Sequence, residues 1–269
     1  MSTENGLNKE LPPRMERNFI TQFRLLSGIN GAILREDDFI TEFRSGYEAS
    51  WMNGVLRTNG SVADLSGQVA ETLKKYAAPV LWRLGALTSE PQLVRDALRA
   101  NGLTLSHSEP GMVLDRKQFC LSPSLPDFKV EFVNRKDTAH DYLIPFANAY
   151  ELSADVVDHF RQFMTARVEN PRSEGWFVGY LGKTAVSTTY YLTDSGVTMI
   201  YAVGTLSEFR NRGYARRTME AAITHAWQHS ESPIALYASE MGHSLYTSMG
   251  FKDLYLLEHY LNSPSAGEF

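Results

Sequence analysis

The chain has 269 residues, enough for one large domain or two modest domains with an apolar core. Its hydrophobic content of 43% and charged content of 21% are ordinary for a globular protein, and a formal net charge of −5 argues against a generally basic, nucleic-acid-binding face. The first twenty residues hold no signal-peptide run, no later run reaches transmembrane length and the single cysteine, Cys120, excludes an intrachain disulfide, so we expect a cytoplasmic protein that binds neither membranes nor nucleic acid.

The first part of the chain, residues 1–119, alternates helical and strand patterns and is expected to form a smaller α/β domain. The patterns predict, in chain order, helices over 15–26 and 37–49, a strand over 51–57, a helix over 62–77, a strand over 79–85, a helix over 90–102 and a strand over 111–116. The last strand–helix–Gly–strand run echoes residues 233–262, which fits a partial duplication and a chance likeness equally well.

Residues 120–127 contain serine and proline but little apolar periodicity, and they predict a linker to a second domain over 128–269. That domain is predicted to contain a strand over 128–134, two helical pieces over 141–168 divided by Pro145 and Ser153, strands over 175–181, 184–193 and 197–205, a helix after Gly213, a strand over 233–239, a helix over 242–249 and a strand over 251–262. Short turns between the three consecutive strands predict an antiparallel meander.

Four arginines surround Gly213 at the predicted start of the helix: Arg210, Arg212, Arg216 and Arg217. A helix N-terminus after a glycine-bearing turn presents free backbone N–H groups and the positive end of its dipole, and so binds phosphate. The pattern Arg-x-x-Gly recurs elsewhere, but only at 210–215 does a strand precede, a helix follow and a small residue fill the sixth position. The alternative is a solvated basic first turn, although arginines there oppose the helix dipole.

Two segments, MIYAVGTLSEFRNRGYARRTMEAAITHA and LYASEMGHSLYTSMGFKDL, resemble motifs of the GNAT superfamily of acetyl-CoA-dependent N-acetyltransferases. The resemblance covers roughly residues 128–262, and residues 79–115 look like the degenerate N-terminal half of some bacterial members. It implies the GNAT fold, an α/β (α+β) architecture with a mixed, mostly antiparallel central sheet flanked by helices.

The resemblance also implies the residues that bind acetyl-CoA. The loop would hold the pyrophosphate through its N–H groups, and the preceding strand would splay from its neighbour and pair its main chain with the pantetheine arm. The implied binding residues are Val203, Gly204, Thr205, Arg210, Asn211, Arg212, Gly213, Tyr214, Ala215, Arg216 and Ser239. Gly204 also fits a simple bulge, and Arg212, Arg216 and Arg217 would meet the 3′-phosphate or face water. Ser239 stands where family members usually carry asparagine, seven residues before the tyrosine.

The implied reaction is transfer of the acetyl group to a primary amine by direct attack in a ternary complex. A backbone N–H near Val203 is the expected oxyanion donor. Tyr246 is the expected catalytic residue, a general acid for the departing thiolate, with a half-buried structural tyrosine as the alternative. The general base stays open among Glu131, Glu151 and Tyr201.

Other features of the sequence leave alternatives. Tyr190, Tyr191 and Tyr201 line an acceptor pocket or belong to the core, and a non-catalytic coenzyme A-binding sensor or scaffold is the second functional reading. The acceptor is a small-molecule or protein amine, and the first domain is expected to wall its site or to form a homodimer. No metal is expected, because His225 and His229 lack a third ligand and suit the end of a helix dipole. The Gly-Lys-Thr run at 182–184 lacks the earlier glycine of a P-loop and reads as a hairpin turn.

Overall fold

The computed structural model describes residues 2–76, 79–169 and 173–262, with side chains from residue 9 onward. By contacts the chain divides into two units, residues 1–111 with 254–269 and residues 112–253, and each is described by itself. The elements that begin in residues 1–111 are α1 (Ser2–Leu26), β1 (Ile33–Glu36), β2 (Ile40–Arg44), the 3₁₀ turn η1 (Ser50–Met52), β3 (Asn53–Thr58), α2 (Leu65–Leu73), β4 (Leu81–Leu84), α3 (Pro91–Ala100) and β5 (Thr104–Leu114). Those that follow are β6 (Phe128–Phe132), α4 (Lys136–Ala149), α5 (Ala154–Thr165), β7 (Glu174–Leu181), β8 (Thr184–Asp194), β9 (Val197–Thr205), the 3₁₀ turn η2 (Ser207–Phe209), α6 (Tyr214–His229), β10 (Ile234–Tyr237), α7 (Glu240–Ser248) and β11 (Phe251–Leu261).

The unit boundaries fall inside β5 and β11 and therefore differ from the division at 120–127 that composition suggests. The reason is strand pairing. β11 runs antiparallel to β4, with Glu258 opposite Leu84 and Leu261 opposite Leu81, so the last strand is hydrogen-bonded within the first unit. Serine and proline mark residues 120–127 as an irregular connection, but composition carries no information about which strands pair across it.

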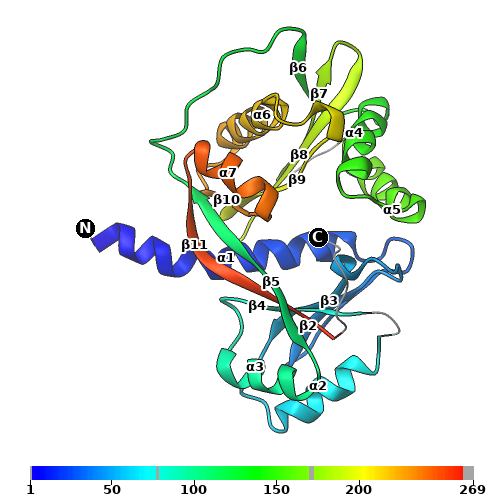
Figure 1. Ribbon diagram of the computed structural model, residues 1–269, viewed down its shortest axis with the longest axis vertical. Helices are drawn as coiled ribbons and strands as arrows, with labels where there is room; N and C mark the ends of the chain where they lie inside the picture. The colour runs from blue at the N-terminus through cyan, green and yellow to red at the C-terminus, as the bar shows by residue number, and fades with distance from the viewer. Residues whose placement is uncertain (1, 77–78, 170–172, 263–269) are drawn as a thin grey trace. The chain divides into compact units, whose positions relative to one another are not determined.

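In the first unit, the strands follow the order β1-β2-β3-β4-β11-β5, and helices cover both faces (Figure 1). Alternate residues of β4 serve opposite faces, as the pleat requires. Trp82 packs with Leu98 of α3 in one apolar cluster. The next residue, Arg83, turns the other way, and its guanidinium lies 5.5 Å from the ring of Phe19 and 5.7 Å from that of Phe23, both on α1.

In the second unit, the strand order is β5-β10-β9-β8-β7-β6, and β6 to β9 form the predicted antiparallel meander. Helix α6 covers one face and α4 the other (Figure 1). On the α6 face, Ser187 Oγ of β8 lies 2.6 Å from Thr218 Oγ1. On the opposite face, a Cβ on Gly204 would come within 2.8 Å of the Ala149 Cβ of α4, so the missing side chain allows this helix to approach β9.

Most predicted elements are present, but the helix predicted over 37–49 is wrong. Residues 40–44 form strand β2 between β1 and β3, and Ile40 through Phe43 are fully buried. Just before this strand, the Asp37 carboxylate accepts hydrogen bonds from the N–H groups of Phe39 and Ile40. β-branched residues suit such a strand, and tertiary pairing overrides the helical spacing. Residue 77, the last of the helix predicted over 62–77, lies outside the described residues.

Pro145 does not divide the two helices of the second unit. α4 begins at Lys136, earlier than predicted, and continues through Pro145. The break comes at Tyr150–Leu152, where Glu151 has a φ of 49°, and Ser153 then stands at the N-cap position of α5. No helix in the described part of the chain combines the length and the apolar character that crossing a bilayer requires.

The connection between β5 and β6 is attached to α6 by one buried carboxylate. Glu220, 1% exposed, accepts from the Ser122 N–H at 3.1 Å, from the Ser122 hydroxyl at 3.0 Å and from Arg217 Nη1 at 2.7 Å. The same Arg217 nitrogen donates to the Ser122 carbonyl at 3.0 Å. Arg217 is therefore the buried carboxylate's ion-pair partner, with its own side chain 27% exposed.

Replacing Glu220 with alanine is expected to lower the free energy of unfolding by about 2–4 kcal/mol, because Ser122 and Arg217 lose their buried acceptor. Urea denaturation followed by circular dichroism measures the loss. The matched control is Glu231→Ala, which breaks an exposed ion pair with Arg116 and is expected to leave stability nearly unchanged. Equal losses in the two variants would contradict the anchoring role of Glu220.

Candidate active site

At the far end of β9, one edge has no strand partner within the part of the chain that the structure describes. β10 pairs with β9 in parallel only from Ile234 opposite Thr198 to Leu236 opposite Ile200, whereas β9 continues to Thr205. Residues 201–205 therefore leave the pairing with β10. Leu206 N–H donates to the β8 residue Val186, so by alternation Thr205 and Val203 direct their main-chain groups to the unpaired edge. The Val203 and Thr205 carbonyls accept side-chain hydrogen bonds, from Tyr150 at 3.4 Å and Arg210 at 3.2 Å, but no strand of the described residues pairs with this edge.

A β-bulge lies at this point. Between the pairs Thr188–Gly204 and Tyr190–Tyr201, β9 contains Ala202 and Val203 where β8 has only Thr189. Ala202 adopts a φ of 50°, a left-handed conformation that is uncommon for alanine, and its carbonyl accepts from Thr188 Oγ1 at 3.0 Å. Bulges bend a strand and redirect its residues, often beside active sites. Alanine carries no sequence signal for this conformation, so sequence reasoning missed it.

The N-terminus of α6 follows directly and is uncapped. Gly213 is the N-cap residue, with a φ of 83°, and no side chain caps this helix. Two residues earlier, Asn211 also has a positive φ, of 60°. Within the described residues we find no protein acceptor for the backbone N–H groups of residues 211–215. A Cβ on Gly213 would meet only Leu125 Cδ1, at 3.7 Å. The loop thus presents free donors in open space, as an anion site requires.

The arginines of this loop have different partners. Arg210 Nε donates to the Thr205 carbonyl at 3.2 Å and so ties the loop to the end of β9. Arg212 lies exposed over the Phe209 ring, 5.8 Å from its centre. Arg216 donates to Ser248 Oγ of α7 and lies 3.9 Å from Glu220. Tyr214 is mostly buried and stacks on Phe128, so its contribution to the loop is its backbone N–H.

The predicted catalytic tyrosine lies on α7. Tyr246 is 7% exposed, its ring packs edge-on against Phe251, and its hydroxyl would lie 2.9 Å from a Cβ on Gly242. Gly242 thus leaves room for the phenol. Ser239 is the N-cap of α7, and its Oγ accepts from the Gly242 N–H at 3.2 Å. Its structural role is helix capping, while its hydroxyl hydrogen is still available to a ligand.

The three candidate bases differ in their position relative to β9 and in their surroundings. Glu131 lies on the edge strand β6, three strand spacings or roughly 14 Å from β9, and pairs with Lys129 at 2.6 Å. Burial, with the nearby Asp194 charge, raises the pKa of Tyr201 well above its ordinary value, which opposes proton acceptance. Glu151 is exposed and adjoins Tyr150, whose hydroxyl donates to the Val203 carbonyl at 3.4 Å.

Aromatic residues of β8 belong to the core. Tyr190, 3% exposed, stacks on Trp176 and donates to Glu174 Oε2 at 2.8 Å. Tyr191, 4% exposed, lies 2.9 Å from His225 Nδ1 through its hydroxyl. His225 is thus occupied, and the i,i+4 histidine pair predicted at the end of α6 stacks with ring centres 4.4 Å apart. Of the three tyrosines, Tyr201 alone is half-buried.

The first unit contains a corresponding strand–helix junction, from β3 to α2, and it is closed. Asn59 forms a bridge with Ser89, and the Gly60 N–H donates to the Ser89 carbonyl at 3.2 Å, so the ends of β3 and β4 are joined. The N-terminus of α2 is capped by Asp64, whose carboxylate accepts from the Gly67 N–H at 3.2 Å. A negative cap at this position repels a phosphate. Of these two junctions, both within the described residues, the one between β9 and α6 combines an open edge with backbone N–H groups that have no protein acceptor.

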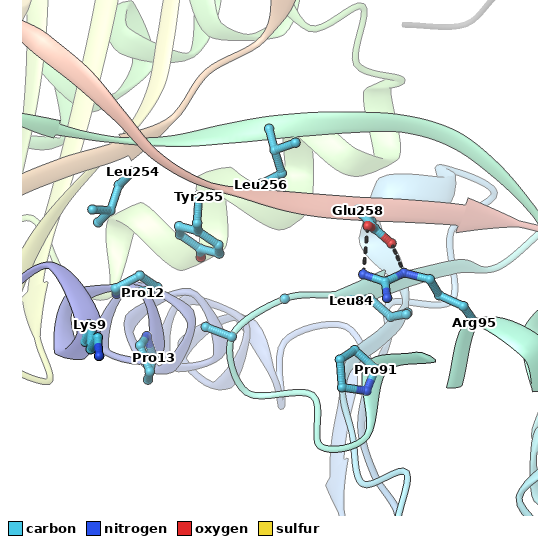
Figure 2. Close-up of a pocket in the computed structure, with 12 residues that line it drawn as sticks. Lys9, Pro12, Pro13, Leu84, Pro91, Arg95, Leu254, Tyr255, Leu256 and Glu258 are labelled. Carbon is cyan, nitrogen blue, oxygen red and sulfur yellow. Dashed lines mark hydrogen bonds and ion pairs between the residues drawn. The ribbon is translucent and has the colours of Figure 1, made fainter. Parts of the chain in front are cut away.

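Two concave regions lie elsewhere in the described chain. One, of about 470 Å³, belongs to the first unit and is lined by α1, β4, α3 and β11, with Arg95 and Glu258 paired through two hydrogen bonds of 2.9 and 3.0 Å (Figure 2). The other, of about 490 Å³, lies between β6 and α6 and contains the Arg217–Glu220 pair. Neither contains a residue of the predicted binding set.

Comparisons with known proteins agree with this geometry. The sequence model of the acetyltransferase (GNAT) family matches residues 137–251. A GCN5-related N-acetyltransferase from Kribbella flavida has a similar structure, with a TM-score of 0.65, 14% identity and coverage of 91% of this chain and 93% of that chain. A functionally unknown conserved protein from Staphylococcus epidermidis has a TM-score of 0.61 and 16% identity, with coverage of 87% of this chain and 95% of that chain.

A tandem GNAT protein from the clavulanic acid biosynthesis pathway has a TM-score of 0.55 and 15% identity, over 74% of this chain and 69% of that chain. At such identities these structures establish a shared fold, which includes the first unit. No curated protein matches the chain. Through residues 137–251, which contain the open strand edge and the uncapped helix, the chain belongs to the acetyltransferase (GNAT) family.

Proposed function

We propose that the protein transfers the acetyl group of acetyl-CoA to a primary amine by direct attack in a ternary complex. GNAT acetyltransferases use acetyl-CoA and acetylate amine acceptors. The observation that carries the proposal is the junction of β9 and α6, where an unpaired strand edge leads within a few residues to an uncapped helix N-terminus. An extended thioester with a diphosphate at one end has the shape and charge for this junction.

Acetyl-CoA binding would use main-chain groups first. The N–H groups of residues 211–215 suit the pyrophosphate, and Arg210 adds positive charge while tying the loop to Thr205. The main chain of Val203 and Thr205 suits the amides of the pantetheine arm. Gly204 has a different role, because its lack of a side chain lets α4 pack closely against β9. Arg212, exposed on the same loop, is suited to the 3′-phosphate.

The chemistry must free an amine and stabilise an oxyanion. An alkyl ammonium with a pKa of about 10.4 costs about 4.6 kcal/mol to deprotonate at pH 7. The Val203 N–H, directed to the unpaired edge beside the bulge, is suited to donate to the developing oxyanion. Tyr246, mostly buried at the end of the neighbouring helix, would protonate the leaving thiolate.

Glu151 is the proposed proton acceptor, directly or through water. It adjoins Tyr150, which contacts the Val203 carbonyl, whereas Glu131 is three strands away and the raised pKa of Tyr201 keeps its phenol protonated. The left-handed backbone at Glu151 ends α4 beside the open edge of β9. This placement supports Glu151 over the other two candidates.

The direct test is to incubate the purified chain with acetyl-CoA and a panel of primary amines, and to detect products by mass spectrometry together with thiol release. Acetylated product that depends on the protein supports the proposal. Tight coenzyme A binding without any product would favour the sensor function instead. Absence of both binding and product would refute the assignment of the junction.

Asn211→Asp tests the phosphate loop without changing side-chain size or the tolerance for positive φ. A new carboxylate beside a diphosphate costs about 1 kcal/mol or more, so calorimetric affinity for coenzyme A should fall about fivefold or more. The control, Asn30→Asp, changes an exposed asparagine of similar backbone conformation in the first unit and should leave the affinity unchanged. An unaltered affinity in the Asn211 variant would remove the loop from the site.

Tyr246→Phe removes only the proposed proton donor. We expect kcat to fall about 100-fold while the dissociation constant of coenzyme A stays the same. Steady-state kinetics and calorimetry measure the two quantities. Tyr180→Phe, whose hydroxyl binds Asp141, is the matched control and should retain activity. Full turnover without the Tyr246 hydroxyl would exclude its acid role.

The pH dependence separates the candidate bases. Because the pKa of Tyr201 is raised, its phenol does not ionise between about pH 6 and 9, and Tyr201→Phe should leave the shape of the pH–rate profile unchanged. Glu151→Gln should lower kcat/KM about 100-fold, because it removes the proposed proton acceptor. If instead Tyr201→Phe flattens the profile, the proposed assignment of the base is wrong.

A further inference from the structure

One peptide unit in the bulge of β9 carries the N–H group that is suited to bind the oxyanion. The carbonyl of Ala202 and the N–H of Val203 belong to the same planar, trans peptide bond, in which the two groups point in opposite directions. Neither residue is part of a register pair between β8 and β9, so regular strand pairing alone does not fix the direction of this unit. A group that holds the Ala202 carbonyl therefore also directs the Val203 N–H.

The side chain of Thr188 holds this carbonyl from the neighbouring strand β8. Its Oγ1 donates to the Ala202 carbonyl at 3.0 Å, and the residue is 0% exposed, so it acts from inside the sheet. The branch at its Cβ restricts rotation about χ1, which keeps the hydroxyl in place. Because the carbonyl is held on the β8 side, the Val203 N–H points to the opposite side, where β9 has no strand partner among the described residues.

The residues around this hydrogen bond leave room for it and do not compete with it. Thr188 stands opposite Gly204, where a Cβ would lie 3.1 Å from Thr188 Oγ1 and would crowd the hydroxyl. The next residue of β8, Thr189, faces the bulge, but its own hydroxyl donates to the Thr188 carbonyl at 2.8 Å. A threonine hydroxyl has one hydrogen to donate, so Thr189 is already engaged.

The backbone of Ala202 needs a contact of this kind. Its φ of 50° is a left-handed conformation, which costs an L-residue free energy because Cβ approaches a carbonyl oxygen. Such a conformation persists where the surrounding structure holds it. The hydrogen bond from Thr188 binds the carbonyl of the strained residue itself. Without this bond the peptide unit could rotate, and the direction of the Val203 N–H would change with it.

We propose that Thr188 is a positioning residue for acetyl transfer, which aims the Val203 N–H at the oxyanion through the peptide unit that joins Ala202 to Val203. This inference rests on the proposed function. The hydrogen bond to the carbonyl also polarises the peptide unit, which makes its N–H a stronger donor.

The step that depends on this N–H is the attack on the thioester. The amine nitrogen forms a bond to the thioester carbon, and the carbonyl electron pair moves to the oxygen, where the N–H stabilises the negative charge. When this pair returns, the C–S bond breaks and the thiolate of coenzyme A leaves. The proton of the amine goes to Glu151, and Tyr246 protonates the thiolate.

The test replaces Thr188 with valine, which is nearly isosteric and lacks the hydroxyl. We expect kcat with acetyl-CoA and an accepted amine to fall at least about tenfold, since small errors of position at the reacting atoms are costly. The calorimetric dissociation constant of coenzyme A should stay within about twofold, because the loss is confined to the transition state. Thr188→Ser restores the hydroxyl and should return kcat to within about threefold of the wild-type value.

The matched control is Thr193→Val, on the same strand. It removes a hydroxyl that lies 2.7 Å from Thr198 Oγ1 of β9, away from the bulge, and should leave kcat unchanged. Circular dichroism checks that each variant folds. If Thr188→Val does not fold alone, the same substitution is compared with Ala202→Gly in the Ala202→Gly chain, because glycine adopts a positive φ without strain. The expected loss of kcat is again at least about tenfold.

The possible results separate this inference from the proposed function. Equal kcat in Thr188→Val and in the wild-type chain, with product formed by both, would overturn the role of Thr188 and leave the proposed function standing. Parallel losses of kcat and of coenzyme A affinity would also overturn it, because they would indicate general damage to the site. If the wild-type chain forms no product, the proposed function fails, and the positioning role fails with it.

Discussion

The candidate active site depends on the early end of the pairing between β9 and β10. Up to Ile200 the main chain of β9 is satisfied on both sides, and beyond it one side has no strand. Unpaired backbone groups cost free energy when they are buried, and when exposed they tend to pair with other chains. Such an edge is therefore expected where a ligand forms the missing hydrogen bonds. The bulge at Ala202, held by the Thr188 hydroxyl, is the local distortion that turns Val203 toward that edge.

The second unit also stabilises α6, the helix whose N-terminus forms one end of the candidate site. Arginines at a helix N-terminus oppose the dipole, and here three of the four have a compensating hydrogen bond or ion pair. Arg217 pairs with buried Glu220, Arg216 with Ser248, and Arg210 with the Thr205 carbonyl. Protein contacts therefore hold their positive charge near the loop over residues 211–215, while within the described residues the backbone N–H groups of that loop have no protein acceptor. Glu220 also attaches the segment after β5 to this helix, which joins site and scaffold.

The two units show how small changes close such a site. Both have a parallel strand pair followed by a helix. In the first unit, the Asp64 carboxylate caps the helix and would repel a phosphate, and Ser89 joins the two strand ends. The parallel strand pair with its helix is common to both units, whereas among the described residues the open edge and the uncapped helix occur together in the second unit. Function in this chain is thus a property of a few backbone groups rather than of the architecture.

The sequence by itself determined the meander of β7 to β9, the helix after Gly213 and the family, because these depend on local periodicity, turn residues and motif spacing. It did not determine the left-handed Ala202, the capping role of Ser239, the core position of Tyr190 or the distance of Glu131 from β9. It also misread residues 40–44 as helical and did not indicate that β11 pairs with β4. Each of these follows from which strands lie side by side, and pairing between residues far apart in the chain is decided only by the packed tertiary structure.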